Sequence, residues 1–403
     1  MRSEVISSQV LAFALIAALG CRDGGESLTG PGAAVPDGAA ATAPLAFVQV
    51  STGAFHSCGV TGDGRAYCWG GNDKGQLGDG ATLFNATRTT PKAVVGGLRF
   101  RHVSAGHEHT CGLTTENRVY CWGLNFWGQL GNGTEGSDHF QVSTPAEVVG
   151  ARRFRQVRAG YSHTCAITMT YAAFCWGENI YGQVGDGTSG VNRPVPVRVL
   201  GGLAWAQLTG GGEHTCGVTR TDRLYCWGWN EHGQLGNGNT ANRSRPTQVS
   251  GGRAFRQVEA GGEHTCAVTT GDLAYCWGRN FQGALGDGTV SDRLTPGAVV
   301  GLRRFAHVSA GANHTCGVTL SGKGYCWGLN GSGQLGDGTL VSRPRPVSLA
   351  VSLSLRQIMA SNMAHTCAVT TSNRAYCWGT GGLLGDGTLT RRPFPTAVVG
   401  PED

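Results

Sequence analysis

Short segments in which apolar and polar residues alternate recur along residues 47–400, and glycine-rich turns separate them. One unit shows the pattern clearly: alternating segments begin at Phe255, His264 and Ala274, and a variable stretch follows that ends near Val299. A period of two residues predicts half-buried β-strands, and none of these segments is long enough for an amphipathic helix. The pattern therefore predicts three or four short strands in each unit.

The unit returns seven times at intervals of 50–54 residues, with boundaries near 47–99, 100–153, 154–204, 205–254, 255–304, 305–354 and 355–400. Repeats of this period that are built from short strands are typical of propeller blades. Seven blades can close on one another and remove the exposed sheet edges that an open array would leave. We therefore predict an all-β fold, a seven-bladed β-propeller over residues 47–400.

Fourteen of the fifteen cysteines form seven pairs with the spacing Cys-x9-Cys, one pair in each unit. If the two cysteines face each other across a hairpin, three loop residues remain, and the third is Gly, Asn or Asp in six units and Tyr171 in the other. This register places the cysteines at a non-hydrogen-bonded site, where Cα atoms approach closely enough for a disulfide. We predict seven disulfides within blades: Cys58–Cys68, Cys111–Cys121, Cys165–Cys175, Cys216–Cys226, Cys266–Cys276, Cys316–Cys326 and Cys367–Cys377.

Metal binding is the alternative role for these cysteines, because a histidine stands two residues before the first cysteine of each pair, as in His56-Ser57-Cys58. Zinc sites usually combine closer cysteine pairs with four ligands. Three such ligands in every unit fit a metal less well than a disulfide, so we expect no metal site.

One histidine and one tryptophan recur at fixed positions in every unit, and we interpret both as structural. The histidine is expected to bond backbone groups of the tight turn before it, and the tryptophan to pack between adjacent blades. The histidines are His56, His109, His163, His214, His264, His314 and His365, and the tryptophans are Trp69, Trp122, Trp176, Trp227, Trp277, Trp327 and Trp378.

The first twenty residues have the features of an export signal. Residues 5–20 form an apolar segment behind Met1 and Arg2 that is too short for a membrane span. Ala18-Leu19-Gly20-Cys21 resembles a bacterial lipobox, and an odd cysteine in an exported protein needs a role. We therefore predict a lipoprotein-type signal peptide over 1–20 and lipid modification of Cys21. The alternative is an ordinary signal peptide with an unpaired Cys21.

Residues 21–46 consist mainly of small and polar residues and proline, so we expect a flexible tether. Together with the lipid, the tether predicts an exported protein anchored at the bacterial cell envelope, at the outer membrane or the cell surface. We expect the membrane to be reached through the lipid anchor alone.

Composition argues against several functions. Charged residues make up 14% of the chain, and its net charge of +6 is spread over scattered arginines without a basic cluster, so we expect no nucleic-acid binding. We find no nucleophile motif and no phosphate loop, and we expect no catalytic site and no cofactor. His107-Glu108-His109 could form a metal pair, but His109 belongs to the structural series.

Three recurring motifs resemble the repeats of the regulator of chromosome condensation family: His-Thr-Cys-Ala-Val-Thr, Tyr-Cys-Trp-Gly-x-Asn-x-x-Gly-Gln-Leu-Gly and Gly-Asp-Gly-Thr. The resemblance covers all seven units and implies four-stranded antiparallel blades. The chain departs from the family in its cysteine pairs and in its last unit, where Thr380–Gly385 is two residues short. Members exchange nucleotide on a nuclear GTPase, sense ultraviolet-B light in plants or inhibit β-lactamases, so the fold leaves function open.

The residues within the Trp-Gly-x-Asn-x-x-Gly loop vary most between units, and several are aromatic. Because the loop recurs at one place in each blade, these side chains should share one propeller face, where aromatic residues favour binding. The alternative is that they are ordinary scattered surface aromatics. We predict a monomeric scaffold that binds a protein or glycan partner through Phe126, Trp127, Tyr181, Trp229 and Phe281. Nucleotide exchange on a small GTPase is the alternative that the family implies, and an enzyme on the propeller face is a third.

Overall fold

The computed structural model describes residues 44–81, 87–136 and 141–401, which contain twenty-eight strands in seven sheets. The predicted signal peptide, Cys21 and residues 21–43 of the predicted tether lie outside the described residues.

The strands fall into seven blades in chain order. Blade 1 contains β1 (Phe47–Thr52), β2 (His56–Thr61), β3 (Ala66–Gly70) and β4 (Arg88–Ala93); blade 2 contains β5 (Phe100–Ala105), β6 (His109–Thr114), β7 (Val119–Leu124) and β8 (Gln141–Glu147); blade 3 contains β9 (Phe154–Ala159), β10 (His163–Thr168), β11 (Ala173–Gly177) and β12 (Arg193–Arg198). Blade 4 contains β13 (Trp205–Gly210), β14 (His214–Thr219), β15 (Leu224–Gly228) and β16 (Arg243–Gln248); blade 5 contains β17 (Phe255–Ala260), β18 (His264–Thr269), β19 (Ala274–Gly278), the short helix η1 (Phe281–Gly283) and β20 (Arg293–Ala298). Blade 6 contains β21 (Phe305–Ala310), β22 (His314–Thr319), β23 (Gly324–Gly328) and β24 (Arg343–Ser348); blade 7 contains β25 (Leu355–Ala360), β26 (His365–Thr370), β27 (Ala375–Gly379) and β28 (Arg392–Ala397).

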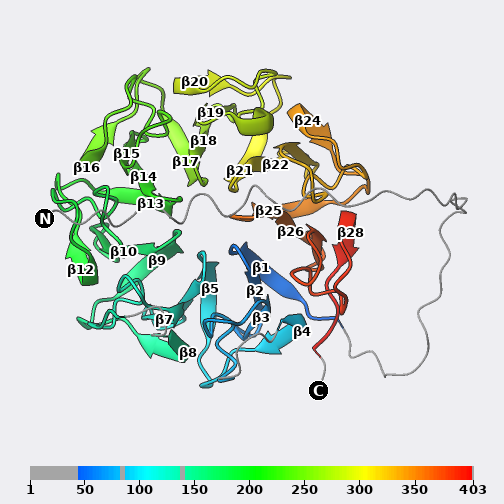
Figure 1. Cartoon of the computed structure of the whole chain (residues 1–403), viewed down its shortest axis with the longest axis horizontal. Coiled ribbons are helices and arrows are strands. Elements are labelled where there is room, and N and C mark those ends of the chain that lie inside the picture. The colour runs from blue at the N-terminus through cyan, green and yellow to red at the C-terminus, as the bar shows by residue number, and fades with distance from the viewer. Residues whose placement is uncertain (1–43, 82–86, 137–140, 402–403) are drawn as a thin grey trace, which may run out of the picture. The chain divides into compact units, whose positions relative to one another are not determined.

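Each blade is one continuous segment whose four strands pair in chain order, and neighbouring strands are antiparallel. The first strands, such as β1, β5 and β9, surround the central axis, and the fourth strands lie at the rim (Figure 1). The predicted seven-bladed propeller of four-stranded antiparallel blades is confirmed.

All seven predicted disulfides are present, with Cα atoms 4.0 to 4.1 Å apart. Cys58 faces Cys68, as the hairpin register predicted. The third loop residue has φ between +57° and +82° in all seven hairpins, and Tyr171 is no exception. The guanidinium groups of Arg155 and Arg220 each lie 4.3 Å from the centre of the Tyr171 ring. These contacts stabilise tyrosine in a conformation that other hairpins give to glycine, asparagine or aspartate.

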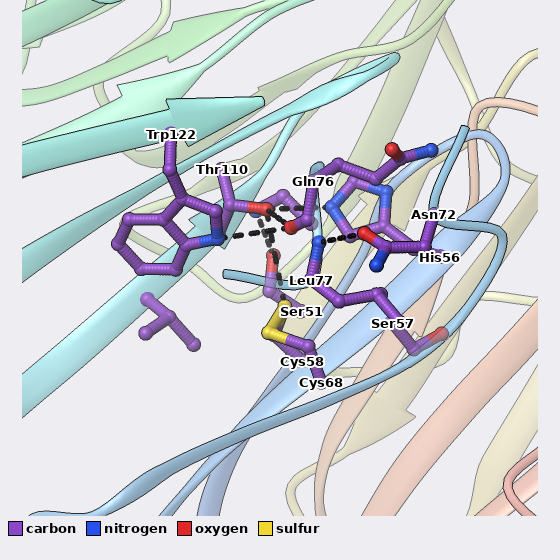
Figure 2. The surroundings of a disulfide bond; sticks show 12 residues. Ser51, His56, Ser57, Cys58, Cys68, Asn72, Gln76, Leu77, Thr110 and Trp122 are labelled. Atoms are coloured by element: carbon purple, nitrogen blue, oxygen red, sulfur yellow. Dashed lines mark hydrogen bonds between the residues drawn. A yellow bond between two sulfur atoms is a disulfide. The ribbon is translucent and has the colours of Figure 1, made fainter. Parts of the chain in front are cut away.

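A separate hydrophobic core fills each junction between neighbouring blades. Between blades 1 and 2, the Cys58–Cys68 disulfide lies in one core with Trp122 of blade 2 (Figure 2). Gly78 has a φ of +68°, and a Cβ atom there would lie 2.6 Å from the indole nitrogen of Trp122, so this close approach requires glycine. The predicted packing role of the recurring tryptophan is confirmed.

The prediction that the recurring histidine bonds the turn before it is wrong, because the ring reaches into the next blade. His56 Nε2 lies 2.7 Å from Thr110 Oγ1, and the Thr110 hydroxyl donates to the carbonyl oxygen of Gln76 at 2.8 Å (Figure 2). Since the hydroxyl has one hydrogen, Nε2 of the histidine donates to it. Trp122 Nε1 donates to the same carbonyl oxygen at 2.9 Å. Burial and neighbouring histidines lower the pKa of His56 to about 3, so the ring is neutral.

The same bond recurs around the ring and joins blade 7 to blade 1. The other pairs are His109–Thr164, His163–Thr215, His214–Thr265, His264–Thr315, His314–Thr366 and His365–Ser57. The Gln357 side chain also pairs with both backbone groups of Val50 at 3.0 Å, and Trp69 Nε1 donates to the Leu383 carbonyl oxygen at 3.1 Å. In the part of the chain that the structure describes, the ring therefore closes through hydrogen bonds and core packing, without a strand shared between blades.

Candidate functional site

Two sets of loops lie side by side on one side of the ring. The turn between the first and second strands of each blade accepts a backbone hydrogen bond from the loop after the third strand, as Leu124 N donates to Glu108 O, Glu178 N to Ser162 O and Trp229 N to Glu213 O. We call this surface the loop face. It comprises the turns near residues 53–55, 106–108, 160–162, 211–213, 261–263, 311–313 and 361–364, together with the loops that begin after β3, β7, β11, β15, β19, β23 and β27.

Recurring amide side chains hold the backbone of the loops after the third strands. Asn125 Oδ1 accepts a hydrogen bond from Leu130 N at 3.0 Å, and Gln129 Oε1 accepts one from Trp127 N at 2.9 Å. In blade 3, Gln183 Oε1 accepts the bond from Tyr181 N at 3.0 Å. Because asparagine and glutamine fix the backbone, the side chains between them can differ from blade to blade without changing the loop.

The five aromatic residues predicted to bind a partner form three groups. Phe126 and Trp127 contact each other at right angles with ring centroids 4.4 Å apart, and Tyr181 of blade 3 lies 6.0 Å from Trp229 of blade 4. Phe281 is 43% exposed, and the Arg279 guanidinium lies 5.5 Å from its ring centroid. Within the described residues no ring contact joins the three groups, so the predicted arc is interrupted.

A second aromatic cluster lies on the turns between the first and second strands, and sequence reasoning missed it. His107 of blade 2 stacks on Tyr161 of blade 3 with ring centroids 3.9 Å apart, and Phe55 of blade 1 meets His107 edge-on at 5.1 Å. These residues differ between units just as the loop aromatics do, and that variation was the signal available in the sequence. His107 is thus occupied by aromatic packing, while His109 bonds Thr164.

Carboxylates on the loop face were also missed. Burial and the charge of Glu213 raise the pKa of Glu178 to about 7, and burial together with the charge of Glu263 raises the pKa of Glu213 to about 7. Burial raises the pKa of Tyr161 to about 12, with contributions from Glu108, Glu213 and Glu263. The face therefore combines aromatic rings with carboxylates over blades 2 to 5.

The axial channel is a poor candidate for a substrate pocket. The innermost strands line it with side chains that include Arg158, Thr209 and Glu259, and its volume is about 70 Å³. That space holds a few water molecules, whereas ligand pockets usually measure several hundred Å³. Thr209 donates a hydrogen bond to Glu259 at 3.2 Å, so the buried carboxylate is partnered inside the ring.

Among the described residues, no group of three or more histidine, cysteine, aspartate or glutamate side chains is placed to hold a metal ion. The fourteen paired sulfur atoms are used in disulfides, which removes the thiolates that the metal alternative required. None of the helical residues described here forms a helix with the length and apolarity to span a membrane.

Family models match most of the chain. A model described as the RCC1-like domain matches residues 16–315, and two models of the regulator of chromosome condensation (RCC1) repeat match residues 305–334 and 321–369. The chain belongs to the RCC1-like domain family. The family resemblance expected from the repeated motifs is thereby confirmed for this RCC1-like propeller.

Relatives of the RCC1-like propeller have different functions. The ultraviolet-B receptor UVR8 of Arabidopsis thaliana is 34% identical over 194 residues, which are 47% of this chain and 43% of the receptor. Yeast RCC1 (Prp20), solved with Kap60, superimposes with a TM-score of 0.72 at 20% identity, over 93% of this chain and 91% of the solved one. Saccharomyces cerevisiae Prp20p, studied for its binding to Gsp1p and histones, gives a TM-score of 0.71 at 21% identity, over 82% and 85%. The match covers less than half of the receptor, and the solved structures share the fold alone.

Proposed function

We propose that this RCC1-like propeller is a membrane-anchored, extracytoplasmic scaffold that binds a protein partner through its loop face. The observation that carries the proposal is the construction of the loops: asparagine side chains hold the backbone in blades 1 to 6, glutamine side chains add a second bond in blades 1 to 4 and 6, and variable aromatic side chains project from several of these loops. Rigid aromatic residues lose little conformational freedom on binding and supply large contact areas. We assign the chain a binding role and no catalytic step.

Protein binding by relatives supports this role. Prp20p has been studied for its binding to Gsp1p and histones, and yeast RCC1 (Prp20) forms a complex with Kap60. Protein recognition is therefore within the capacity of the fold, and the side chains of the loop face determine which partner is bound.

Site-specific photocrosslinking tests the binding face. A photoreactive phenylalanine analogue at Trp127 or Tyr181 of the full-length chain should capture one partner in the cells that produce it, whereas the same analogue at Met169 or Leu320 should not. Met169 and Leu320 are the matched controls because both are well exposed and follow the second strands, at the opposite ends of the blades. Equal capture from the loop-face positions and from the control positions would contradict the proposal that the partner binds the loop face.

Substitution then tests the side chains themselves. Replacing Trp127 and Tyr181 together by alanine should abolish binding of the captured partner, and the melting temperature should stay within a few degrees because both side chains are only half-buried. Unchanged affinity would show that these two residues are not part of the interface.

The proposed anchor rests on the lipobox-like residues Ala18–Cys21 and has its own test. Cells grown with a radiolabelled fatty acid should label the wild-type protein in the membrane fraction. Cys21→Ser should carry no label. A wild-type protein without label would contradict the lipid anchor. The loop-face proposal would be unaffected, because photocrosslinking tests it separately.

A further inference from the structure

Two carboxylates on the loop face have no cationic partner among the described residues. Glu178 directly follows β11 of blade 3, and Glu213 directly precedes β14 of blade 4. Glu178 is only 6% exposed, whereas Glu213 is half-buried. In the described part of the chain, neither Glu178 nor Glu213 forms an ion pair or accepts a side-chain hydrogen bond. An ionised, buried carboxylate without a donor or a counter-ion is costly, so Glu178 and the neighbouring Glu213 would be stabilised by a positive charge at this junction.

Aromatic rings stand beside these carboxylates at the same junction. Trp229 N donates to the carbonyl oxygen of Glu213 at 2.9 Å, and the Trp229 ring lies 6.0 Å from that of Tyr181 with an interplanar angle of 39°. Burial raises the pKa of the Tyr181 hydroxyl, and the charges of Glu213, Glu178 and Glu231 raise it further. Glu178 and Tyr181 belong to the same loop after β11, and the turn of Glu213 bonds the Trp229 backbone, so the rings and carboxylates share the junction of blades 3 and 4.

Blade 5 contains a related arrangement that includes its own cation. Glu263 occupies the position of Glu213, and Arg279 occupies the position of Trp229, one residue after the recurring Trp-Gly. Arg279 forms an ion pair with Glu263, and its guanidinium also lies 5.5 Å from the Phe281 ring centroid. A guanidinium thus lies against both a carboxylate and an aromatic ring on the same face. At blades 3 and 4 the carboxylates and rings are present, and none of the described arginines pairs with these carboxylates.

We propose that the junction of blades 3 and 4 binds an arginine side chain of the partner protein, held by the carboxylates of Glu178 and Glu213 and by the rings of Tyr181 and Trp229. The inference rests on the proposed function, because it assigns the chemistry of one contact on the loop face. Arginine fits better than lysine because its planar group both stacks on rings and bonds two carboxylate oxygens. The aromatic walls favour an organic cation over a metal ion.

Titration of the full-length chain with N-acetylarginine amide tests the site without a partner. The indole N–H resonance of Trp229, assigned by its loss in Trp229→Phe, is followed by NMR at pH 8, where both carboxyls are ionised because their pKa values lie near 7. The resonance should shift and saturate in the millimolar range. N-acetylcitrulline amide, which has the same shape without the charge, should cause no saturable shift, and N-acetyllysine amide should bind more weakly.

Variants identify the groups responsible. Glu178→Gln with Glu213→Gln should weaken arginine binding at least about tenfold, which corresponds to roughly 1.4 kcal/mol. Glu147→Gln is the matched control, because Glu147 pairs with Arg118 away from this junction, and it should bind as the wild type does. Equal shifts with arginine and citrulline amides, or full binding by the double variant, would overturn the proposal.

The two proposals fail in different experiments. If a partner is photocrosslinked from Trp127 or Tyr181 but N-acetylarginine amide causes no shift, the loop face binds a partner and the arginine site is rejected. Arginine-amide binding without any photocrosslinked partner would keep the site and reject the protein-binding role.

Discussion

The Thr265 hydroxyl receives a hydrogen bond from His214 Nε2 at 2.9 Å and donates its own hydrogen to the Gln234 carbonyl oxygen at 2.8 Å. Trp277 Nε1 donates to the same oxygen at 3.0 Å. One hydroxyl therefore joins the histidine of blade 4 to the loop that packs against the tryptophan of blade 5. At the scale of single residues, the ring is held by such fully buried polar chains.

Thr265→Val should destabilise the protein, because it leaves the buried Nε2–H of His214 without an acceptor. We expect the free energy of unfolding to fall by about 1–3 kcal/mol, measured by urea denaturation. Thr247→Val is the control: its hydroxyl bonds only the exposed Arg245 carbonyl oxygen, and the expected change is within about 0.5 kcal/mol. Equal effects of the two substitutions would contradict the role assigned to the hydroxyl.

Glu178 and Glu213 predict a pH dependence of stability. Their pKa values rise from 4.5 to about 7 in the folded chain, so between these values the folded state retains protons that the unfolded state has lost. The stability from these groups is therefore fully present below pH 4.5 and is lost as pH rises through 7. Glu178→Gln with Glu213→Gln should raise the unfolding free energy at pH 8 by roughly 1–3 kcal/mol and leave it nearly unchanged at pH 4.5.

Thermal melts of the wild type and the double variant at pH 4.5 and pH 8 measure this difference. A double variant that is no more stable than the wild type at pH 8 would contradict the raised pKa values. The expected result has a cost for function, because the more stable variant is the one expected to lose the arginine site.

At the scale of the element, the disulfide hairpin is the unit that the sequence predicted best. Register, loop length and disulfide pairing are decided by residues that lie within ten positions of one another, so their pattern can be read along the chain. The partner of each histidine lies 51 to 55 residues away in all but the last blade. The repeated sequence does not show which way the histidine ring points, so this partner was not predicted.

The candidate site was predicted only in part, because its side chains come from different blades. The loops that carry Trp127, Tyr181 and Trp229 were identified from their variation, but their grouping depends on which blades meet and how each ring turns. Glu178 and Glu213 were not singled out from the sequence, because nothing in the repeat indicates that these carboxyl groups are shielded from solvent in the folded chain. Sequence periodicity predicts blades, whereas the chemistry arises at the junctions.

Each hairpin disulfide should contribute independently to stability. Replacing Cys266 and Cys276 together by alanine removes one closed loop of the unfolded chain and should lower the unfolding free energy by about 2–3 kcal/mol. Thiol titration of the denatured, unreduced wild-type protein should find none of the fourteen paired cysteines reactive. Fourteen reactive thiols in that assay would refute the disulfides.

At the scale of the whole molecule, the ring is a closed circle of similar junctions. Blade 7 meets blade 1 through a histidine–hydroxyl bond of the kind found at every junction, and through a glutamine–backbone bond of the kind found at most of them. Since no strand crosses that junction in the described residues, the order in which blades follow one another along the chain should be dispensable for folding.

A circular permutant tests this equivalence. Joining residue 401 to residue 44 through a glycine–serine linker and opening the chain between the exposed Gly201 and Gly202 should preserve the fold, with a melting temperature within a few degrees of the unpermuted protein. Opening the chain at Val218 inside β14 should instead prevent folding, because it breaks a central strand. An unfolded first permutant would show that the blade 7–blade 1 junction differs from the others.

The absence of a strand shared by blades 1 and 7 within the described residues also determines how the molecule resists mechanical force. A pull on the two ends of the propeller acts on the blade 7–blade 1 junction first, where side-chain bonds, isolated backbone bonds such as Phe47 N to Asn373 O, and one hydrophobic core oppose it. Once that junction parts, the blades should detach one after another. Each detached blade would still retain a hairpin locked by its disulfide, so the extended chain would remain shorter than its residue count implies.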